Sequence, residues 1–342
     1  MIIDCHGHYT TAPPALQHYR DRQLARLIDS SLPYSSGPQI SDEQICQTIE
    51  QNQLRQQRLR GIDMVLFSPM AGGMSHHSGP EATSLEWTRV CNDLIHRVVG
   101  LFPDNFVGVC QLPQSPGVSP ANSAAELERC VRELGFVGCN INPDPTDGYW
   151  RDAPLTDRSW YPLYEKMVEL DVPAMIHVSC SCNPNFHGVG AHYLNGDTTA
   201  FMQLLTADLF RDFPSLRLII PHGGGAVPYH WGRYRGLAID MGKPPLPEHL
   251  LGNVFFDTCV YHQAGIDLLT RVVPAENILF ASEMIGAVRS IDPETGRPFD
   301  DTRTMIEATD LPRTEKTKIF RDNALRVFPR LAQRVATGGR AA

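Results

Sequence analysis

The sequence predicts an α/β protein folded as a (β/α)8 TIM barrel, in which eight parallel strands alternate with helices. Two observations predict this fold class: short apolar runs recur eight times along the 342 residues, and longer amphipathic segments separate them. A third observation disfavours the alternative, an open doubly wound sheet, because no Gly-x-Gly-x-x-Gly segment follows any of the apolar runs. A chain of this length fits one barrel with insertions.

The apolar runs are short enough to be buried strands. They lie at residues 1–5, 64–67, 106–111, 136–141, 174–178, 216–220, 254–256 and 278–281. Amphipathic segments predict helices between them, at residues 84–102, 124–134, 157–170 and 198–213.

Two stretches exceed a minimal barrel, residues 10–53 after the first predicted strand and residues 284–313 after the eighth. The first includes a predicted helix that begins near Asp42 and runs to about Leu59. Both stretches leave the carboxyl ends of strands, so both are expected to cover the active-site face. We predict insertions after strands 1 and 8 of a single domain, residues 1–335, followed by a frayed tail at residues 336–342.

The composition excludes several classes of protein. A net charge of −8 argues against a nucleic-acid-binding surface, which would be basic. No apolar run approaches the roughly 20 residues that a membrane span needs, and an acid with two histidines follows Met1 too closely for a signal peptide. The nine cysteines form an odd number without a disulfide framework. We therefore expect a cytoplasmic protein with reduced thiols that binds neither nucleic acid nor a membrane.

Polar residues stand at the carboxyl ends of four predicted strands. The first strand ends on His6 and His8, and the fifth, sixth and eighth end on His177, His222 and Glu283. Residues i and i+2 of a strand point to the same side, about 6.5–7 Å apart, so His6 and His8 can bind one ion. One such histidine alone is more often a hydrogen-bonded core residue, but four strands that end in this way predict a metal site at the mouth of the barrel.

These motifs resemble those of the amidohydrolase superfamily over the whole chain, with His-x-His on strand 1, a histidine on each of strands 5 and 6, and an acid on strand 8. The resemblance implies one divalent ion, Zn²⁺ with Mn²⁺ as an alternative, because strand 4 ends on Asn140 and Asn142 where binuclear members have a bridging Lys or Glu. The implied metal ligands are His6, His8, His177 and Glu283. The implied catalytic residues are Glu283, His222 and His177. Asp257, at the end of the seventh strand, is a candidate for orienting His222 or for a capping role.

The segments around these motifs are similar to those of a narrower family, the 4-oxalomesaconate hydratases. They are IIDCHGHYT (2–10), FPDNF (102–106), QLPQSPG (111–117), PHGGGAVPYHWGR (221–233), FDTCVYH (256–262) and FASEMIG (280–286). Two positions depart from a common pattern. Glu283 replaces the Asp that most of the superfamily has, and its extra methylene suits proton transfer to a substrate carbon. Met70 stands where this resemblance predicts a basic residue.

The resemblance implies a lyase, a metal-dependent hydratase that reversibly adds water across the C=C of a keto-tricarboxylate in protocatechuate or gallate degradation, and that is usually a homodimer. The ion would lower the pKa of water towards ~7, Glu283 would move the carbon proton, and His222 would stabilise the enolate oxygen. A non-oxidative, metal-dependent decarboxylase of an aromatic or muconate semialdehyde-type acid is the alternative within the superfamily. A non-catalytic ligand-binding barrel is the alternative from another class.

A trianionic substrate also needs polar and cationic contacts. The candidates are His76, Asn183, His192, Tyr193, Arg233 and Arg289. For each arginine, a solvated surface charge is an equal alternative. Cys180 and Cys182 could form a metal or redox pair, but a Cys-x-Cys without a second pair is a weak signal, so we expect these thiols to pack within a loop.

Overall fold

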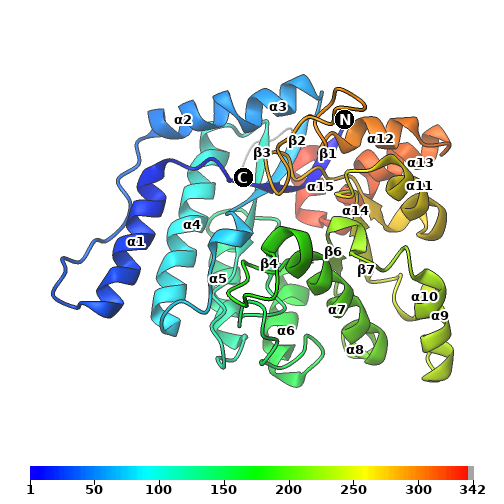
Figure 1. Ribbon diagram of the computed structural model, residues 1–342, viewed down its shortest axis with the longest axis horizontal. Helices are drawn as coiled ribbons and strands as arrows, with labels where there is room; N and C mark the ends of the chain where they lie inside the picture. Colours follow the sequence, from blue (N-terminus) through cyan, green and yellow to red (C-terminus); the bar gives the residue numbers. More distant parts are fainter. Residues whose placement is uncertain (338–342) are drawn as a thin grey trace.

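Eight parallel strands pair in chain order in the computed structural model, which describes residues 1–337 (Figure 1). The strands are β1 (Ile3–His8), β2 (Met64–Ser68), β3 (Phe106–Gln111), β4 (Gly138–Ile141), β5 (Ala174–Ile176), β6 (Leu218–Ile220), β7 (Val254–Asp257) and β8 (Ile278–Leu279). The Cys5 amide donates to the Phe280 carbonyl at 2.9 Å, and the Glu283 amide donates to the His6 carbonyl at 3.0 Å. These bonds join the segment after β8 to β1, so the predicted barrel is confirmed.

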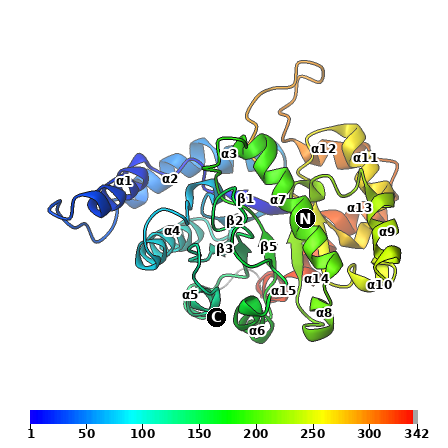
Figure 2. The same ribbon diagram turned by 60° about the horizontal axis from the view of Figure 1, so that its bottom comes forward.

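Helices surround the strands, as Figure 2 shows from a second direction. They are α1 (Pro14–Ile28), α2 (Asp42–Gln51), α3 (Gln53–Leu59), α4 (Glu81–Leu101), α5 (Ala121–Arg132), α6 (Tyr161–Leu170), α7 (Tyr193–Thr206), α8 (Leu209–Asp212), α9 (Trp231–Asp240), α10 (Leu246–His249), α11 (Gln263–Val272), α12 (Thr302–Ala308), α13 (Arg313–Thr317), α14 (Asn323–Val327) and α15 (Pro329–Ala336). Shorter 3₁₀ or π turns lie between them at Ala71–Gly73, Arg158–Trp160, Gly188–His192, His222–Gly224, Ala275–Asn277 and Lys318–Asp322.

Alternate residues of each strand face opposite sides, which divides the apolar core into two layers. Val65 and Phe67 of β2 pack with the surrounding helices, whereas Met64 and Leu66 belong to a smaller apolar cluster with Phe328, between α14 and α15. The strands therefore supply apolar residues to both sides along most of their length. Polar side chains appear where β1, β7 and the segments after β5, β6 and β8 reach the carboxyl end of the barrel.

The insertion after β1 is more helical than predicted. Helix α1 was not predicted, and the helix expected from Asp42 to Leu59 is divided at Asn52 into α2 and α3. Tyr19 of α1 donates to Glu86 of α4 at 2.8 Å, so α1 lies beside α4 (Figure 1). The expectation that residues 10–53 as a whole cover the active-site face is therefore wrong, because α1 and α2 instead extend the helical layer along α4.

The remaining predicted bounds shift by a few residues. The helix expected at 198–213 begins at Tyr193 and breaks after Thr206, where Ala207 is extended. The stretch after β8 contains α12, so residues 284–313 are not a loop throughout. Residues 338–342, which are most of the tail predicted at 336–342, lie outside the described residues. None of the helices within residues 1–337 combines the length and the apolar character that a bilayer span requires.

Candidate active site

Four imidazole rings and one carboxylate meet at the mouth of the barrel. This barrel-mouth cluster consists of His6, His8, His177, His222 and Glu283, all of which are buried. The Nε2 atoms of His6 and His8 are 2.9 Å apart, and those of His8 and His177 are 3.4 Å apart. One ligand atom from each of His6, His177, His222 and Glu283 lies within 4.8 Å of the others. The structure thus brings together the strand-end residues that the sequence singled out.

The Nδ1 atoms of three of these rings face hydrogen-bond acceptors. His177 Nδ1 lies 2.7 Å from the Val178 carbonyl oxygen, and His8 Nδ1 lies 3.2 Å from the Pro69 carbonyl oxygen and 2.7 Å from Ser68 Oγ. His6 Nδ1 lies 2.8 Å from the Asp257 carboxylate. Because carbonyl and carboxylate oxygens only accept, these contacts assign the ring proton to Nδ1 and leave a lone pair on each Nε2.

The Nε2 atom of His8 lies 2.9 Å from that of His6 and 3.4 Å from that of His177, and with the protons on Nδ1 no proton lies between these lone pairs. A cation between them would convert this repulsion into coordination, and neutral imidazole is a preferred ligand of divalent transition metals. Burial also lowers the pKa of His8 and of His177 well below the usual range, which keeps both rings neutral. The donor set therefore fits a divalent ion, with backbone or side-chain acceptors fixing each ring from behind.

His222 has the opposite electrostatic environment. Its Nδ1 lies 2.9 Å from Asp197 Oδ2, while its Nε2 is buried and has no hydrogen-bond partner. Burial alone would lower the pKa of His222, but the charge and hydrogen bond of Asp197, followed by the charge of Glu283, raise it to about 9. Burial raises the pKa of Asp197 to about 6, so at neutral pH the pair holds its proton on the imidazole. His222 is consequently suited to donate a proton or hydrogen bond from Nε2.

The Glu283 carboxylate lies beside the same ring. Glu283 Oε2 is 3.9 Å from His222 Nε2 and accepts a hydrogen bond of 2.6 Å from the Tyr261 hydroxyl. His222, Tyr261 and Glu283 all have positive φ angles, between 50° and 61°. Non-glycine residues adopt this left-handed conformation rarely, and they concentrate at functional sites, where the surrounding structure must hold them in place.

Two predicted substrate-binding residues lie close to this cluster. The Tyr193 ring is 5.1 Å from the His177 ring and 5.5 Å from the His222 ring. Burial raises the pKa of the Tyr193 hydroxyl, so it stays protonated and can donate. The preceding residue, His192, is fully buried, and neither of its ring nitrogens has a hydrogen-bond partner. Both residues stand at the start of α7, so one helix presents them together.

The other predicted substrate-binding residues either make contacts with loop or helix residues or are exposed to solvent. His76 is buried, with Nδ1 3.3 Å from Ser84 Oγ at the start of α4. The Asn183 amide donates to the Gly148 carbonyl and so joins two loops. Arg233 and Arg289 are exposed. Their exposure fits the solvated-charge alternative at least as well as substrate contact.

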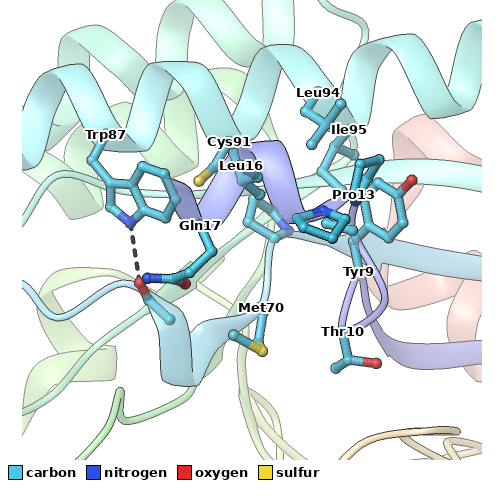
Figure 3. A pocket seen from close by; sticks show the side chains of 14 residues that line it. Tyr9, Thr10, Pro13, Leu16, Gln17, Met70, Trp87, Cys91, Leu94 and Ile95 are labelled. Atoms are coloured by element: carbon cyan, nitrogen blue, oxygen red, sulfur yellow. Dashed lines mark hydrogen bonds between the residues drawn. The ribbon is translucent and has the colours of Figure 1, made fainter. Parts of the chain in front are cut away.

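The surroundings of Met70, where a basic residue was expected, are apolar. A cavity of about 190 Å³ opens between α1 and α4, and Figure 3 shows Met70 and Trp87 on its wall together with Thr10 and Gln17. No charged side chain lines this cavity. The cavity itself therefore offers no cation to a substrate carboxylate.

Several residues of the site were missed or misassigned from the sequence. Asp257 was a candidate for orienting His222, but its Oδ2 lies against His6 and its Oδ1 accepts from the Gly223 amide, so this interpretation is wrong. Asp197 takes that place from within α7. Tyr261, which donates to Glu283, was also missed; it lies four residues beyond Asp257, within a quoted motif, and only the left-handed backbone turns it back to the cluster.

Comparison with known proteins agrees with this geometry. The family model described as amidohydrolase matches residues 3–330. The chain belongs to the amidohydrolase family. It is 59% identical to the 2-keto-4-carboxy-3-hexenedioate hydratase of Sphingobium sp. over 339 residues, which cover 99% of each chain.

A further relative and a solved structure carry the names of two different activities. The chain is 29% identical to the gamma-resorcylate decarboxylase of Polaromonas sp., over 88% of this chain and 94% of the relative. Among solved structures, the 4-oxalomesaconate hydratase LigJ of Rhodopseudomonas palustris matches with a TM-score of 0.93 and 56% identity over 99% of both chains. The family therefore includes both hydratases and decarboxylases.

Proposed function

We propose that this amidohydrolase-family chain is a lyase, a hydratase that adds water reversibly across the C=C of 4-oxalomesaconate. The full-length identity of 59% to a named hydratase supports this activity. The single structural observation that carries the proposal is the position of Glu283, whose carboxylate lies between the Tyr261 hydroxyl and the unpartnered Nε2 of His222. Such a pair of neighbouring groups, one a base and one a proton donor, is what addition to a conjugated ketone needs.

We assign the divalent ion to His6, His8, His177 and Glu283. Support comes from the Nε2 contacts that join His6 to His8 and His8 to His177. The Glu283 carboxylate groups with His6, His177 and His222, so His8 enters the set through its contacts with His6 and His177. When bound, such an ion supplies a Lewis acid that lowers the pKa of water towards ~7. We propose Zn²⁺, with Mn²⁺ as the alternative, and a single ion, because β4 and the residue after it present the amides of Asn140 and Asn142 rather than a bridging Lys or Glu.

Glu283 acts in this proposal as the general acid and base. Hydration places an oxygen on the carbon β to the ketone and a proton on the carbon α to it. Glu283 delivers that proton in the forward direction and removes it in reverse. The Tyr261 hydroxyl, which donates to Oε2, orients the carboxylate for this transfer.

His222 stabilises the charge that develops on the ketone oxygen. With the proton held on the imidazole by Asp197, Nε2–H is a donor in a buried site, where a hydrogen bond to an oxyanion is stronger than in water. His222 thereby steadies the enolate until Glu283 protonates the carbon. His177 belongs to the ligand set and fixes the ion relative to both groups.

The three substrate carboxylates require donors around the mouth. Tyr193 and His192 are the strongest candidates, since the first contacts the rings of His177 and His222 and the second has two unpartnered nitrogens. Asn142 is a further candidate, because its buried Nδ2 also lacks a partner. His76, Asn183, Arg233 and Arg289 remain predictions.

The alternative is a non-oxidative decarboxylase, which the 29% identity to a gamma-resorcylate decarboxylase favours. It would use the same ion but should prefer Asp at position 283. One assay separates the two activities. The purified protein is incubated with 4-oxalomesaconate and, separately, with an ortho-hydroxybenzoate, while enone absorbance and CO2 are followed. We expect loss of enone absorbance without CO2; CO2 release without hydration would refute the proposal.

The proposal extends to the compartment, the oligomeric state and the pathway of the protein. We propose a cytoplasmic homodimer that degrades aromatic compounds, which follows from the resemblance to hydratases of protocatechuate and gallate breakdown. The nine cysteines of the chain are all free, in accord with a reducing compartment.

A further inference from the structure

A second group of metal-ligating side chains lies outside the barrel-mouth cluster. His77, Asp147 and Cys180 place one ligand atom each within 4.8 Å of the others; we call them the loop cluster. They come from three different loops, which follow β2, β4 and β5. No step of the proposed hydration uses any of the three.

We propose that the loop cluster is a second metal site, which binds a thiophilic divalent cation such as Zn²⁺ or Cd²⁺. Imidazole, carboxylate and thiolate are the donor types found together in tetrahedral zinc sites, with solvent in the remaining position. A thiolate with one carboxylate would also neutralise the charge of a divalent ion. The proposal does not depend on the hydratase activity.

The contacts inside the loop cluster centre on one oxygen. Asp147 Oδ2 lies 2.6 Å from His77 Nδ1 and 3.2 Å from Cys180 Sγ. The second oxygen, Oδ1, is buried and has no hydrogen-bond partner. A carboxylate with one crowded and one unpartnered oxygen can rearrange to ligate an ion, whereas a purely structural carboxylate would normally have both oxygens satisfied.

The loops hold these donors in place before any ion binds. Asp144 accepts hydrogen bonds from the amides of Thr146 and Gly148 and so shapes the turn around Asp147. The Ser75 amide donates to Ser179 Oγ at 3.0 Å, which joins the loop of His77 to that of Cys180. Asp147 itself has a left-handed backbone, with φ of 49°. Such a fixed geometry reduces the ordering that metal binding would require.

An ion can reach the loop cluster from solvent. The His77 side chain is 32% exposed, whereas Asp147 is fully buried beneath it. Burial and the Asp147 charge raise the pKa of Cys180 to about 11, so the ion must displace the thiol proton, which leaves to solvent.

Cys182 provides a matched control two residues away. It is exposed, and its Sγ lies 3.4 Å from the Asp147 carbonyl rather than from the carboxylate. By spacing alone Cys180 and Cys182 are an equivalent pair, but the structure places only Cys180 among metal-ligating groups.

The test is a cadmium titration of the holoenzyme with its resident ion already bound. We expect one further equivalent of Cd²⁺ with a thiolate-to-cadmium charge-transfer band in the ultraviolet. Cys180→Ser and Asp147→Asn should lose the further equivalent, and Cys180→Ser should lose the band, whereas Cys182→Ser should keep both. Circular dichroism before the titration checks that each variant is folded.

Absence of a further equivalent in the wild type would overturn the proposal, as would a band that survives Cys180→Ser or disappears in Cys182→Ser. Cadmium NMR of the wild type supplies a readout that needs no variant. We expect a resonance coupled to the β protons of a single cysteine, Cys180, and coupling to any other cysteine would contradict the assignment.

Discussion

The barrel-mouth cluster and the loop cluster solve the problem of buried polar groups in different ways. In the first, acceptors behind the rings of His6, His8 and His177 occupy each Nδ1 and leave three Nε2 lone pairs facing one another. In the second, Asp147 faces both His77 and Cys180, so protons satisfy most of the polar atoms. The donor set of the barrel mouth therefore fits a cation, whereas the loops can hold either protons or a metal.

The position of the residues on strands or in loops explains part of the difference between the two clusters. His6 and His8 lie on β1, and the other barrel-mouth residues lie within four residues of a strand end, so the sheet fixes their approximate spacing. The loop cluster depends on hydrogen bonds among loops. We therefore expect substitutions at the barrel mouth to lower turnover and the affinity for the resident ion. Substitutions in the loop cluster should instead abolish binding of the further equivalent of metal.

The largest expected effect is that of Glu283→Gln. Gln keeps the shape and one oxygen of the side chain but cannot carry a proton to carbon, so turnover should fall by about 10²–10⁴-fold. Because Glu283 is also an assigned ligand, resident metal content is measured by elemental analysis and turnover is compared per bound ion. Tyr261→Phe is the matched control, since it removes only the hydrogen bond to Oε2 and should cost less. Near-normal turnover in Glu283→Gln would eliminate its acid–base role.

Asp257→Asn should weaken the resident metal by about 10–100-fold. The amide can present N–H to His6 Nδ1, which would move the ring proton to Nε2 and block the lone pair. Competition with a chelator measures the affinity. Asp147→Asn is the control from the loop cluster, and it should leave this affinity unchanged. Equal losses in the two variants would remove the distinction between the clusters.

His76 and His77 should give opposite pH dependences of stability although they are neighbours. Burial lowers the pKa of His76 to about 3 in the folded protein from its ordinary 6.5. The stability that neutral His76 allows is present above pH ~6.5 and is lost as pH falls; between pH 7 and 5 the loss is about 2 kcal/mol. In urea unfolding, the decline between pH 7 and 5 should be about 2 kcal/mol smaller in His76→Gln than in the wild type, and His8 and His177 should keep their own share of it.

His77 has the reverse sign. The hydrogen bond to Asp147 raises the pKa of His77, so its contribution is present at low pH and is lost as pH rises through that raised value. His77→Gln should therefore retain the full acid decline that His76→Gln reduces. A similar pH profile for both variants would contradict the burial assigned to His76.

Asp197→Asn should produce the smallest of these effects. Without the carboxylate, the pKa of His222 falls from about 9, so the alkaline decline of turnover should move to lower pH. We expect a shift of about one pH unit, equivalent to about 1.4 kcal/mol. Profiles of kcat and kcat/KM against pH measure it. An unchanged alkaline limb would show that Asp197 does not set the protonation of His222.

The sequence was sufficient for the barrel and for the strand-end residues because both depend on regular geometry. Apolar runs of strand length predict β1 to β8, and the carboxyl ends of parallel strands bring His6, His177 and Glu283 together. Asp197 was not predictable in this way, because it reaches His222 from the middle of α7, 25 residues earlier in the chain.

Loop geometry explains the remaining errors. Tyr261 reaches Glu283 only because its backbone is left-handed, which no periodicity indicates. Asp257 sits on β7 as expected, but the direction of its side chain selects His6 rather than His222. The loop cluster depends on contacts among three separate loops, so spacing within the sequence, such as that of Cys180 and Cys182, carries little information about it.

The central claim is that Glu283 delivers a proton to carbon while His222 stabilises the enolate oxygen. Its most direct test is the reaction in deuterium oxide followed by NMR. The holoenzyme is given 4-oxalomesaconate, and the product and headspace are analysed together. Our account predicts one deuterium on one face of the carbon next to the ketone, a new hydroxyl on its neighbour, and no CO2. Release of CO2 with no hydrated product would contradict it.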